Sequence, residues 1–291
     1  DLPEDLHYTA WTGQRTIANI ERAVSEKRPF FIWSSYHDPH PPYLVSEPWA
    51  SMYDPEEMIP GEYTEGEFDT MPPHFAKTRE KAPDFSMYHE TWGPHGFTSH
   101  VIDTHTLKKN VAVYYGMISF MDRWIGKTLD TLDRLGIADR TLVVFTTDHG
   151  HFLGQHGLVA KGAFHYEDML RIPMIARYPG RIPAGKTVSA LQSLVDLSPT
   201  FLAMAGLPVP GLMQGIDQYD VWCGTRRKVR DHVIVENRHE PTKVHLRTYI
   251  DERYKITVYR NEKYGELFDC LLYTSDAADE LDGVDLGGRR I

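Results

Sequence analysis

Hydrophobic positions recur at helical spacing in two segments of the chain, residues 14–27 and residues 106–135. Spacing of about one helical turn brings the apolar side chains to one face, so each segment is predicted to form an amphipathic helix. Gly136 directly follows the second segment and indicates where that helix ends. The apolar positions of the two stripes are Ile17, Ile20 and Val24, then Val111, Tyr115, Ile118, Met121, Ile125, Leu129, Leu132 and Leu135.

Three shorter runs predict strands. Residues 29–35 are almost wholly apolar, which is typical of a strand that is buried on both faces of a sheet. Residues 141–147 and 173–178 are predicted to form further strands, and a helix is predicted over residues 196–205. Strands that alternate with helices indicate an α/β fold with a mixed, mainly parallel sheet flanked by helices.

The pattern changes after Gly224. Residues 1–224 contain all the predicted α/β elements, whereas residues 225–269 alternate polar and apolar positions over short runs. Such alternation predicts antiparallel strands with one solvated face. We therefore expect a main α/β domain followed by the incomplete start of a small antiparallel β subdomain. Its predicted strands are residues 232–236, 244–250 and 254–260.

Periodicity fails between residues 44 and 104, where Pro, Gly, Met, Tyr, Trp and His dominate. A connection of that length within a compact domain is usually either functional or disordered. Its aromatic content favours an ordered insertion that covers the site and shapes the substrate pocket. The aromatic residues concerned are Trp49, Tyr53, Tyr63, Tyr88 and Trp92.

Composition narrows the classes of function. The 291 residues carry a formal net charge of −10 with no basic block, which argues against a nucleic-acid-binding surface. No apolar run approaches the roughly 20 residues that a membrane span needs. The chain opens on residues 1–5 without a Met or an apolar leader, and its two cysteines form no disulfide framework. Oligomeric state and cellular location stay open.

Residues 270–291 fit a translated DNA adapter. Back-translation of residues 270–280 and 283–291 fits the two parts of a transposase adapter used in short-read sequencing, separated by an index-length gap. The alternative is a genuine acidic, disordered tail. We expect this segment to be disordered and to pack against nothing, so that Cys223 is the single native cysteine.

Asp148, His149 and Gly150 follow the predicted strand over residues 141–147. Open α/β folds bind ligands in the crevice beyond the carboxyl ends of their strands, and a carboxylate with an imidazole can hold a divalent cation there. The alternative is a structural Asp that caps the next turn beside a His that donates to a backbone carbonyl. The glycine-rich residues 154–157 that follow favour the metal site.

Other polar residues near these motifs suit the binding of an anion. Lys161 is a point charge suited to a sulfate or phosphate oxygen, although a lone lysine in a loop is usually solvated. His40 could donate a proton to a departing alkoxide and His37 could assist it, or both could be structural. Glu167 and Arg171 are expected to pair within the fold or to orient Lys161.

Several segments together resemble the type I, formylglycine-dependent sulfatases of the alkaline phosphatase superfamily. The resemblance implies an alkaline-phosphatase-like fold and covers residues 1–269, although it thins over residues 44–104. The matching segments are residues 146–157, 161–167, 171–180, 29–33, 37–42, 214–217 and 264–269.

The resemblance also implies roles for individual residues. Asp148 and His149 would supply half of a metal site for calcium, with magnesium or another divalent cation as alternatives. Lys161 would bind the sulfate ester, and His40 would contact the bridging oxygen and assist the leaving group. The further candidates for substrate binding are His37 and His156.

Three motifs of the family are missing from the chain. These are the Cys-x-Pro/Ala-x-Arg stretch that yields formylglycine, an early pair of aspartates, and a Gly-Lys-Trp-His segment. Cys223 lies in Trp-Cys-Gly-Thr-Arg, which is the wrong context for the nucleophile. We therefore expect an N-terminally truncated chain whose formylglycine belongs to the missing part, and which is inactive as written.

The leading hypothesis is part of a sulfuric-ester hydrolase that acts on a sulfated small molecule or glycan. One alternative is a phosphonate or phosphate ester hydrolase of the same superfamily. Another is a non-catalytic protein that binds sulfated glycans. The nucleophile region discriminates between them, because a formylglycine-type cysteine favours the sulfatase whereas Thr or Ser favours phosphoryl transfer.

Overall fold

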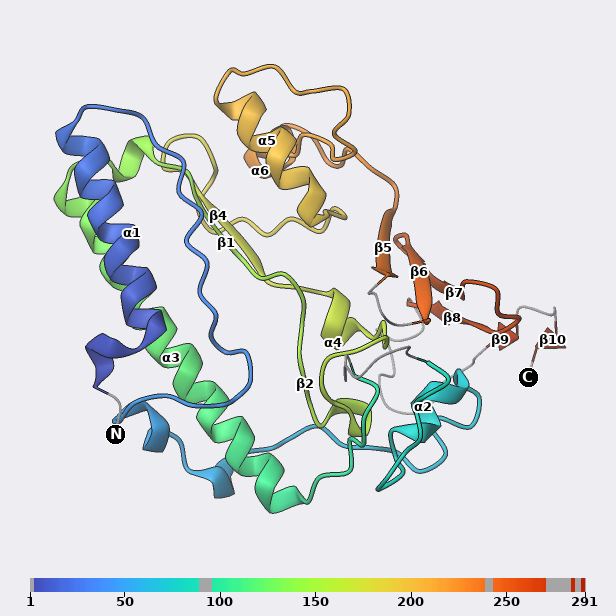
Figure 1. The fold of residues 1–291 in the computed structure, drawn as a ribbon. Helices are drawn as coiled ribbons and strands as arrows, with labels where there is room; N and C mark the ends of the chain where they lie inside the picture. The colour runs from blue at the N-terminus through green and yellow to red at the C-terminus, as the bar shows by residue number, and fades with distance from the viewer. Residues whose placement is uncertain (1–2, 89–95, 239–242, 271–283, 286–288, 291) are drawn as a thin grey trace. The chain divides into compact units, whose positions relative to one another are not determined.

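The computed structural model describes residues 3–88, 96–238, 243–270, 284–285 and 289–290 (Figure 1). The chain divides into two compact units. Unit 1 contains residues 1–61, 102–143 and 177–180, and unit 2 contains residues 62–101, 144–176 and 181–291.

Two helices form the frame of unit 1. Helices α1 (Tyr8–Ser25) and α3 (Thr104–Arg134) lie side by side, which confirms both helices predicted from the periodicity (Figure 1). Their approach is close at Gly13, where an added Cβ would lie 2.6 Å from the Trp124 ring. The shorter helical turns of this unit are η1 (Glu4–Leu6), η2 (Trp49–Ser51), η3 (Pro55–Glu57) and η4 (Ala138–Arg140).

The predicted strand over residues 29–35 is wrong, because this segment is extended but belongs to no described strand. Phe30 and Ile32 pack on a cluster between the two helices, whereas Phe31 and Trp33 are 70% and 67% exposed. An apolar run becomes a strand only when a second backbone pairs with it. Among the described residues no ladder does so here, and one face of the segment is packed instead of two.

The part of unit 2 that contains the candidate site residues consists mainly of short strands. Strand β1 (Val143–Thr146) pairs with β4 (Met174–Arg177), which confirms the strands predicted near these positions. Strands β2 (Phe152–Leu153) and β3 (Val159–Ala160) form an antiparallel hairpin around the turn η5 (Gln155–Gly157). Helix α4 (Glu167–Leu170) follows the hairpin.

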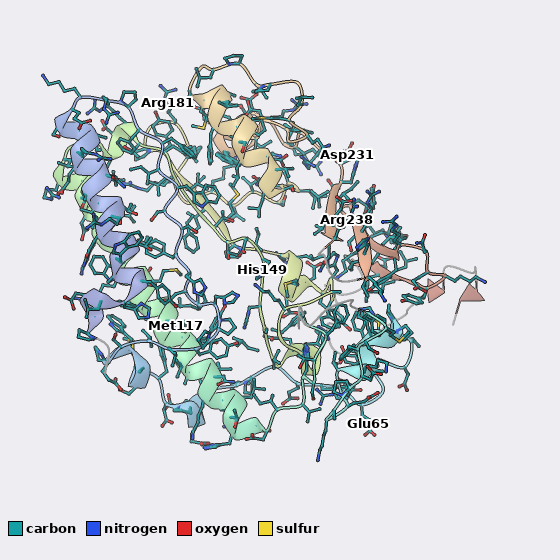
Figure 2. All side chains as sticks on the ribbon, in the orientation of Figure 1. Glu65, Met117, His149, Arg181, Asp231 and Arg238 are labelled. Atoms are coloured by element: carbon teal, nitrogen blue, oxygen red, sulfur yellow. The ribbon has the colours of Figure 1, made fainter. Side chains whose placement is uncertain are left out.

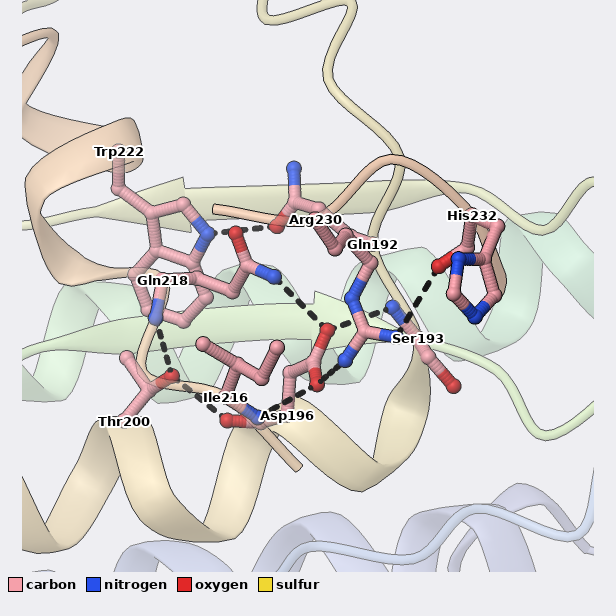
Figure 3. Close-up of polar contacts among 9 residues, drawn as sticks. All are labelled: Gln192, Ser193, Asp196, Thr200, Ile216, Gln218, Trp222, Arg230 and His232. Atoms are coloured by element: carbon pink, nitrogen blue, oxygen red, sulfur yellow. Dashed lines mark hydrogen bonds and ion pairs between the residues drawn. The ribbon is translucent and has the colours of Figure 1, made fainter. Parts of the chain in front are cut away.

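Residues 194–223 add helices that are held by one buried carboxylate. The predicted helix over residues 196–205 is present as η6 (Leu194–Asp196) and α5 (Leu197–Met204), and α6 (Tyr219–Cys223) follows. Asp196 is 1% exposed. Figure 3 shows its carboxylate accepting hydrogen bonds from the Ser193 and Ile216 amides, the Gln218 side chain and the Arg230 guanidinium. A buried charge is stable only with such partners.

The C-terminal part of unit 2 is a four-stranded antiparallel sheet in sequential order. Three of its strands confirm the predicted antiparallel strands, and the fourth is an addition to them. The boundary expected after residue 224 stays a prediction. Its strands are β5 (Val233–Arg238), β6 (His245–Ile250), β7 (Tyr254–Tyr259) and β8 (Gly265–Asp269).

Little of the expected adapter tail is described. Strands β9 (Val284–Asp285) and β10 (Arg289–Arg290) pair with each other in antiparallel fashion. Residues 271–283, 286–288 and 291 lie outside the described residues. β9 also contacts β8, so the expectation that the segment packs against nothing is wrong for its described residues. The disorder expected of the other residues stays a prediction.

The second part of the predicted insertion, residues 62–101, packs inside unit 2. Phe68 and Phe75 join a buried cluster with Phe152 and Phe164 of the hairpin region. A second cluster joins Phe85, Tyr88 and Phe97 to the C-terminal sheet. The described residues of this segment, 62–88 and 96–101, are therefore ordered by aromatic packing, and their regular structure is α2 (Pro73–Lys77). Trp92 lies outside the described residues.

None of the helices in the described part of the chain combines the length and the hydrophobicity needed to cross a bilayer.

Candidate active site

Asp148, His149 and Lys161 converge in unit 2. The His149 Nδ1 lies 2.7 Å from the Gly150 carbonyl and donates to it, so Nε2 carries the lone pair. The Lys161 ammonium lies 3.1 Å from this Nε2, and an Asp148 carboxylate oxygen lies 3.4 Å from it. Figure 2 shows His149 beside α4. The structure thus brings together three of the residues predicted from the sequence.

Gly150 fixes the backbone beside His149. Its amide donates to the Met169 carbonyl of α4 at 2.9 Å. An added Cβ would lie 1.7 Å from the Asp168 carbonyl, so only glycine allows α4 to pack this closely. The Asp148 side chain folds back and accepts from the His149 amide at 3.0 Å. The motif is therefore shaped by local hydrogen bonds and by contact with α4.

The β2–β3 hairpin connects His149 to Lys161. Its turn requires left-handed backbone at Gly154, His156 and Gly157, with φ of 105°, 56° and 65°. Glycine adopts such angles readily, but a side chain at positive φ is strained and needs support from its surroundings. Lys161 follows β3 directly, so the turn and β3 together set the position of its backbone.

His156 is held between two carboxylates. Its Nδ1 contacts Glu67, its Nε2 lies 3.5 Å from Asp168 Oδ2, and its ring stacks on Tyr166 at 3.7 Å. Burial lowers the pKa of His156, but hydrogen bonds and charges from Asp168 and Glu67 outweigh that effect and raise the pKa to about 9. The ring is an imidazolium at neutral pH. Its predicted role in substrate binding stays a prediction.

Two buried histidines of the 62–101 segment support the same region. His100 Nδ1 accepts from the Val159 amide at 3.0 Å, and His74 Nε2 donates to the Ala163 carbonyl at 2.9 Å. Burial lowers the pKa of each ring to about 4, so both are neutral at pH 7. Lys161 lies between these two anchored positions in the sequence.

Sequence reasoning missed these supporting residues. Arg79 is another, since its guanidinium donates to the Gly157 carbonyl at 2.7 Å. They come from an aperiodic segment that offers no local signal, and Glu67 lies 89 residues from His156 in the chain. Asp168 could have been found more easily, because it is adjacent to Glu167, which was predicted.

Glu167 and Arg171 occupy different environments. The Glu167 carboxylate lies 3.4 Å from the ammonium of Lys255 in β7. The Arg171 side chain is exposed, and its amide donates to the Glu167 carbonyl at 2.8 Å. That either residue orients Lys161 stays a prediction.

His37 and His40 belong to unit 1. Their rings lie 4.8 Å apart, and His40 Nδ1 donates to the Pro41 carbonyl at 2.6 Å. Between them Asp38, which sequence reasoning overlooked, is 4% exposed and accepts from Tyr8 and Thr9 hydroxyls at 2.5 Å each. Burial and the adjacent carboxylate raise the pKa of Tyr8. Convergence of either histidine with Lys161 stays a prediction.

The metal prediction can be tested against the donors present. The lone pair on His149 Nε2 and the Asp148 carboxylate fit two ligands of a divalent cation. Across the described residues, no group of three or more His, Cys, Asp or Glu side chains is arranged to hold a metal. That Asp148 and His149 supply part of a metal site therefore stays a prediction, and so does the choice of calcium over another divalent cation.

A family model described as Sulfatase matches residues 7–207, more than half of the chain. This chain belongs to the sulfatase family. A second model, described as N-sulphoglucosamine sulphohydrolase, C-terminal, matches residues 154–280. In this sulfatase-family chain, Asp148, His149 and Lys161 all lie within the first match. The family identified from the sequence is confirmed.

Three similar proteins illustrate the match. An N-acetylglucosamine-6-O-sulfatase from Bacteroides thetaiotaomicron is 45% identical over 102 residues, which cover 35% of this sulfatase-family chain and 18% of that protein. A phosphonate monoester hydrolase from Silicibacter pomeroyi has a TM-score of 0.75 at 23% identity, covering 94% of this chain and 55% of its own. A structure described as a complex with its substrate D-glucosamine-2-N,6-O-disulfate has a TM-score of 0.55 at 28% identity, covering 64% and 37%.

These likenesses confirm the predicted α/β fold. The chain spans no more than 55% of the length of any of the three proteins.

Proposed function

We propose that the protein containing this chain hydrolyses a sulfate ester, and that Lys161 binds the sulfate group. The observation that carries the proposal is the placement of the Lys161 ammonium 3.1 Å from His149 Nε2, with the Asp148 carboxylate beside it. One small region thus brings an ammonium together with an imidazole and a carboxylate, and these contacts support the proposal. This combination suits chemistry on a sulfate oxygen.

Each residue has a defined task in the proposal. Asp148 and His149 bind a divalent cation, which when present polarises the sulfate oxygens. Lys161 neutralises negative charge on the same group. His40 is the proton donor to the bridging oxygen, and His37 binds substrate next to it. The family resemblance implies a formylglycine nucleophile, for which this chain has no matching cysteine motif.

The names of two similar proteins support a substrate class. One is named an N-acetylglucosamine-6-O-sulfatase, and another binds a glucosamine that carries a 6-O-sulfate. We therefore take a 6-O-sulfated N-acetylglucosamine as the first substrate to test. Phosphonate ester hydrolysis is the second candidate, because a phosphonate monoester hydrolase has a similar fold over most of the chain.

The test compares the two reactions in one enzyme preparation. The gene product that contains this chain is assayed for sulfate release from N-acetylglucosamine 6-sulfate and for hydrolysis of a phenyl phosphonate monoester. We expect preferential sulfate release, which Lys161→Met should reduce by about 100-fold or more. Lys263→Met is the control, since Lys263 is exposed in the turn between β7 and β8.

Two outcomes would overturn the proposal. One is hydrolysis of the phosphonate ester without sulfate release. The other is equal activity in the Lys161→Met and Lys263→Met variants, since Lys161 would then have no part in binding the ester.

A further inference from the structure

His156 connects three segments of unit 2 that are distant in the chain. Glu67 comes from the insertion, His156 from the hairpin turn, and Asp168 from α4. The Glu67 side chain is 5% exposed, so this ion pair is shielded from solvent on one side. The Tyr166 hydroxyl also approaches Glu67, at 3.5 Å.

Two of these segments, α4 and the hairpin, adjoin the residues of the proposed sulfate site. α4 contacts Gly150 through the Met169 and Asp168 carbonyls, next to His149. The hairpin turn leads through β3 to Lys161. The contact between His156 and Asp168 therefore joins the turn, in the middle of the segment from His149 to Lys161, to the helix that packs on Gly150.

We propose that Glu67 and Asp168 are positioning residues that hold His156 between them and thereby place Lys161 beside His149. The backbone at His156 supports the idea, because this non-glycine residue has φ of 56°. Such a conformation persists only where surrounding contacts stabilise it. Two carboxylates and a stacked tyrosine supply those contacts.

We call His156 and its two carboxylate partners the ion triad. The hairpin turn also has supports outside the ion triad, and these show what the triad adds to the position of the turn. Arg79 binds the Gly157 carbonyl, and its guanidinium lies 4.4 Å from the centre of the Tyr63 ring. His100 binds the Val159 amide. Both contacts reach the hairpin from residues 62–101, whereas Asp168 is the member of the triad that joins the turn to the helix beside Gly150. Removal of the triad should therefore loosen the link to His149 and leave the hairpin folded.

The charged groups around His156 are Glu67 from the insertion, Asp168 from α4, Arg79 behind Gly157 and, at longer range, Lys255 from β7. The carboxylates lie against the ring and favour its charged form, which agrees with a pKa of about 9. Loss of one carboxylate should lower that pKa by more than about 1 unit.

The inference rests on the proposed function in one respect, which is that Lys161 binds sulfate. The experiment uses the full chain in three forms: the natural sequence, Glu67→Gln and Asp168→Asn. NMR follows the titration of the His156 ring, and amide hydrogen exchange follows residues 154–161. Binding is measured with inorganic sulfate as the probe.

The matched control is Glu56→Gln. Glu56 makes a similar contact with a histidine, 3.7 Å from His105, but both side chains are more than 60% exposed in unit 1. The control should change none of the three measurements.

We expect both test variants to lower the pKa of His156, speed amide exchange in the turn, and weaken sulfate binding by about three- to tenfold. If the two carboxylates only stabilised the fold, the pKa of His156 and the affinity for sulfate would not change together. Glu67→Asp should restore part of the affinity, because it keeps the charge. Unchanged exchange in residues 154–161 in both Gln and Asn variants would overturn the positioning role.

The two proposals fail in different ways. If the natural chain binds no sulfate, or binds it equally after Lys161→Met, the role of Lys161 fails while exchange in residues 154–161 still decides the positioning role. If sulfate binds through Lys161 but is insensitive to Glu67→Gln and Asp168→Asn, the positioning role fails and the proposed function stands.

Discussion

His156 should make the stability of the protein depend on pH above neutrality. The perturbation is His156→Gln, which removes the imidazolium from between Glu67 and Asp168. The folded pKa of about 9 lies above the ordinary value of 6.5, so the folded state binds the proton more tightly. This stabilisation is fully present below about pH 6.5 and is lost as the pH rises through about 9.

The magnitude follows from the size of the pKa difference. A pKa shift from 6.5 to about 9 corresponds to a contribution of at most about 3 kcal/mol to the free energy of unfolding. The side chains of His156 and Asp168 are each 30% exposed, so solvent screens part of the interaction. We expect about 1 to 2 kcal/mol to be measurable.

The assay is urea unfolding of the natural chain and of His156→Gln at about pH 6 and about pH 9.5, on either side of the titration. The difference in unfolding free energy between the two proteins should shrink by about 1 to 2 kcal/mol at the higher pH. Other titrating groups are common to both proteins and cancel. His105→Gln, at an exposed pair, should show no such change. An equal difference at both pH values would refute the reasoning.

Three further predictions concern single side chains. Gly150→Ala should lower the unfolding free energy by about 3 kcal/mol, measured by thermal unfolding, because its Cβ would collide with α4; an unchanged Tm would contradict the packing. Asp196→Asn should lower it by about 3 kcal/mol in urea, because it leaves the Arg230 guanidinium without its carboxylate, and a neutral effect would contradict the buried pair. Burial raises the pKa of Glu266 to about 7, so stability from its bound proton is present below about pH 4.5 and lost as the pH rises through 7. Glu266→Gln should flatten that loss in a urea series, and an unaltered slope would contradict the assignment.

Local patterns predicted the helices and the C-terminal strands because each depends on neighbours within its own segment. The α3 stripe is an example, since its apolar face repeats over the whole helix. The apolar run at residues 29–35 misled because the pattern cannot show whether a second backbone pairs with it. Phe31 and Trp33 remain exposed where a buried strand was expected.

The residues of the candidate site also divide into those that local sequence predicts and those that depend on distant segments. Asp148, His149 and Lys161 lie within one short stretch of sequence and were predicted together. Glu67 could not be predicted, because its importance comes from a contact with His156 made across 89 residues. Long-range partners of this kind become visible only when the fold brings the segments together.

The central claim is that Asp148, His149 and Lys161 form one site for a cation and a sulfate group. The most direct measurement is NMR of the His149 ring during titration with calcium, and with magnesium in parallel, in the presence and absence of inorganic sulfate. Because Lys161 contacts His149 Nε2, sulfate should draw the ammonium away and strengthen the effect of the cation on His149. That enhancement should disappear in Lys161→Met. A His149 ring that responds to neither cation, or an equal enhancement by sulfate in Lys161→Met, would contradict the claim.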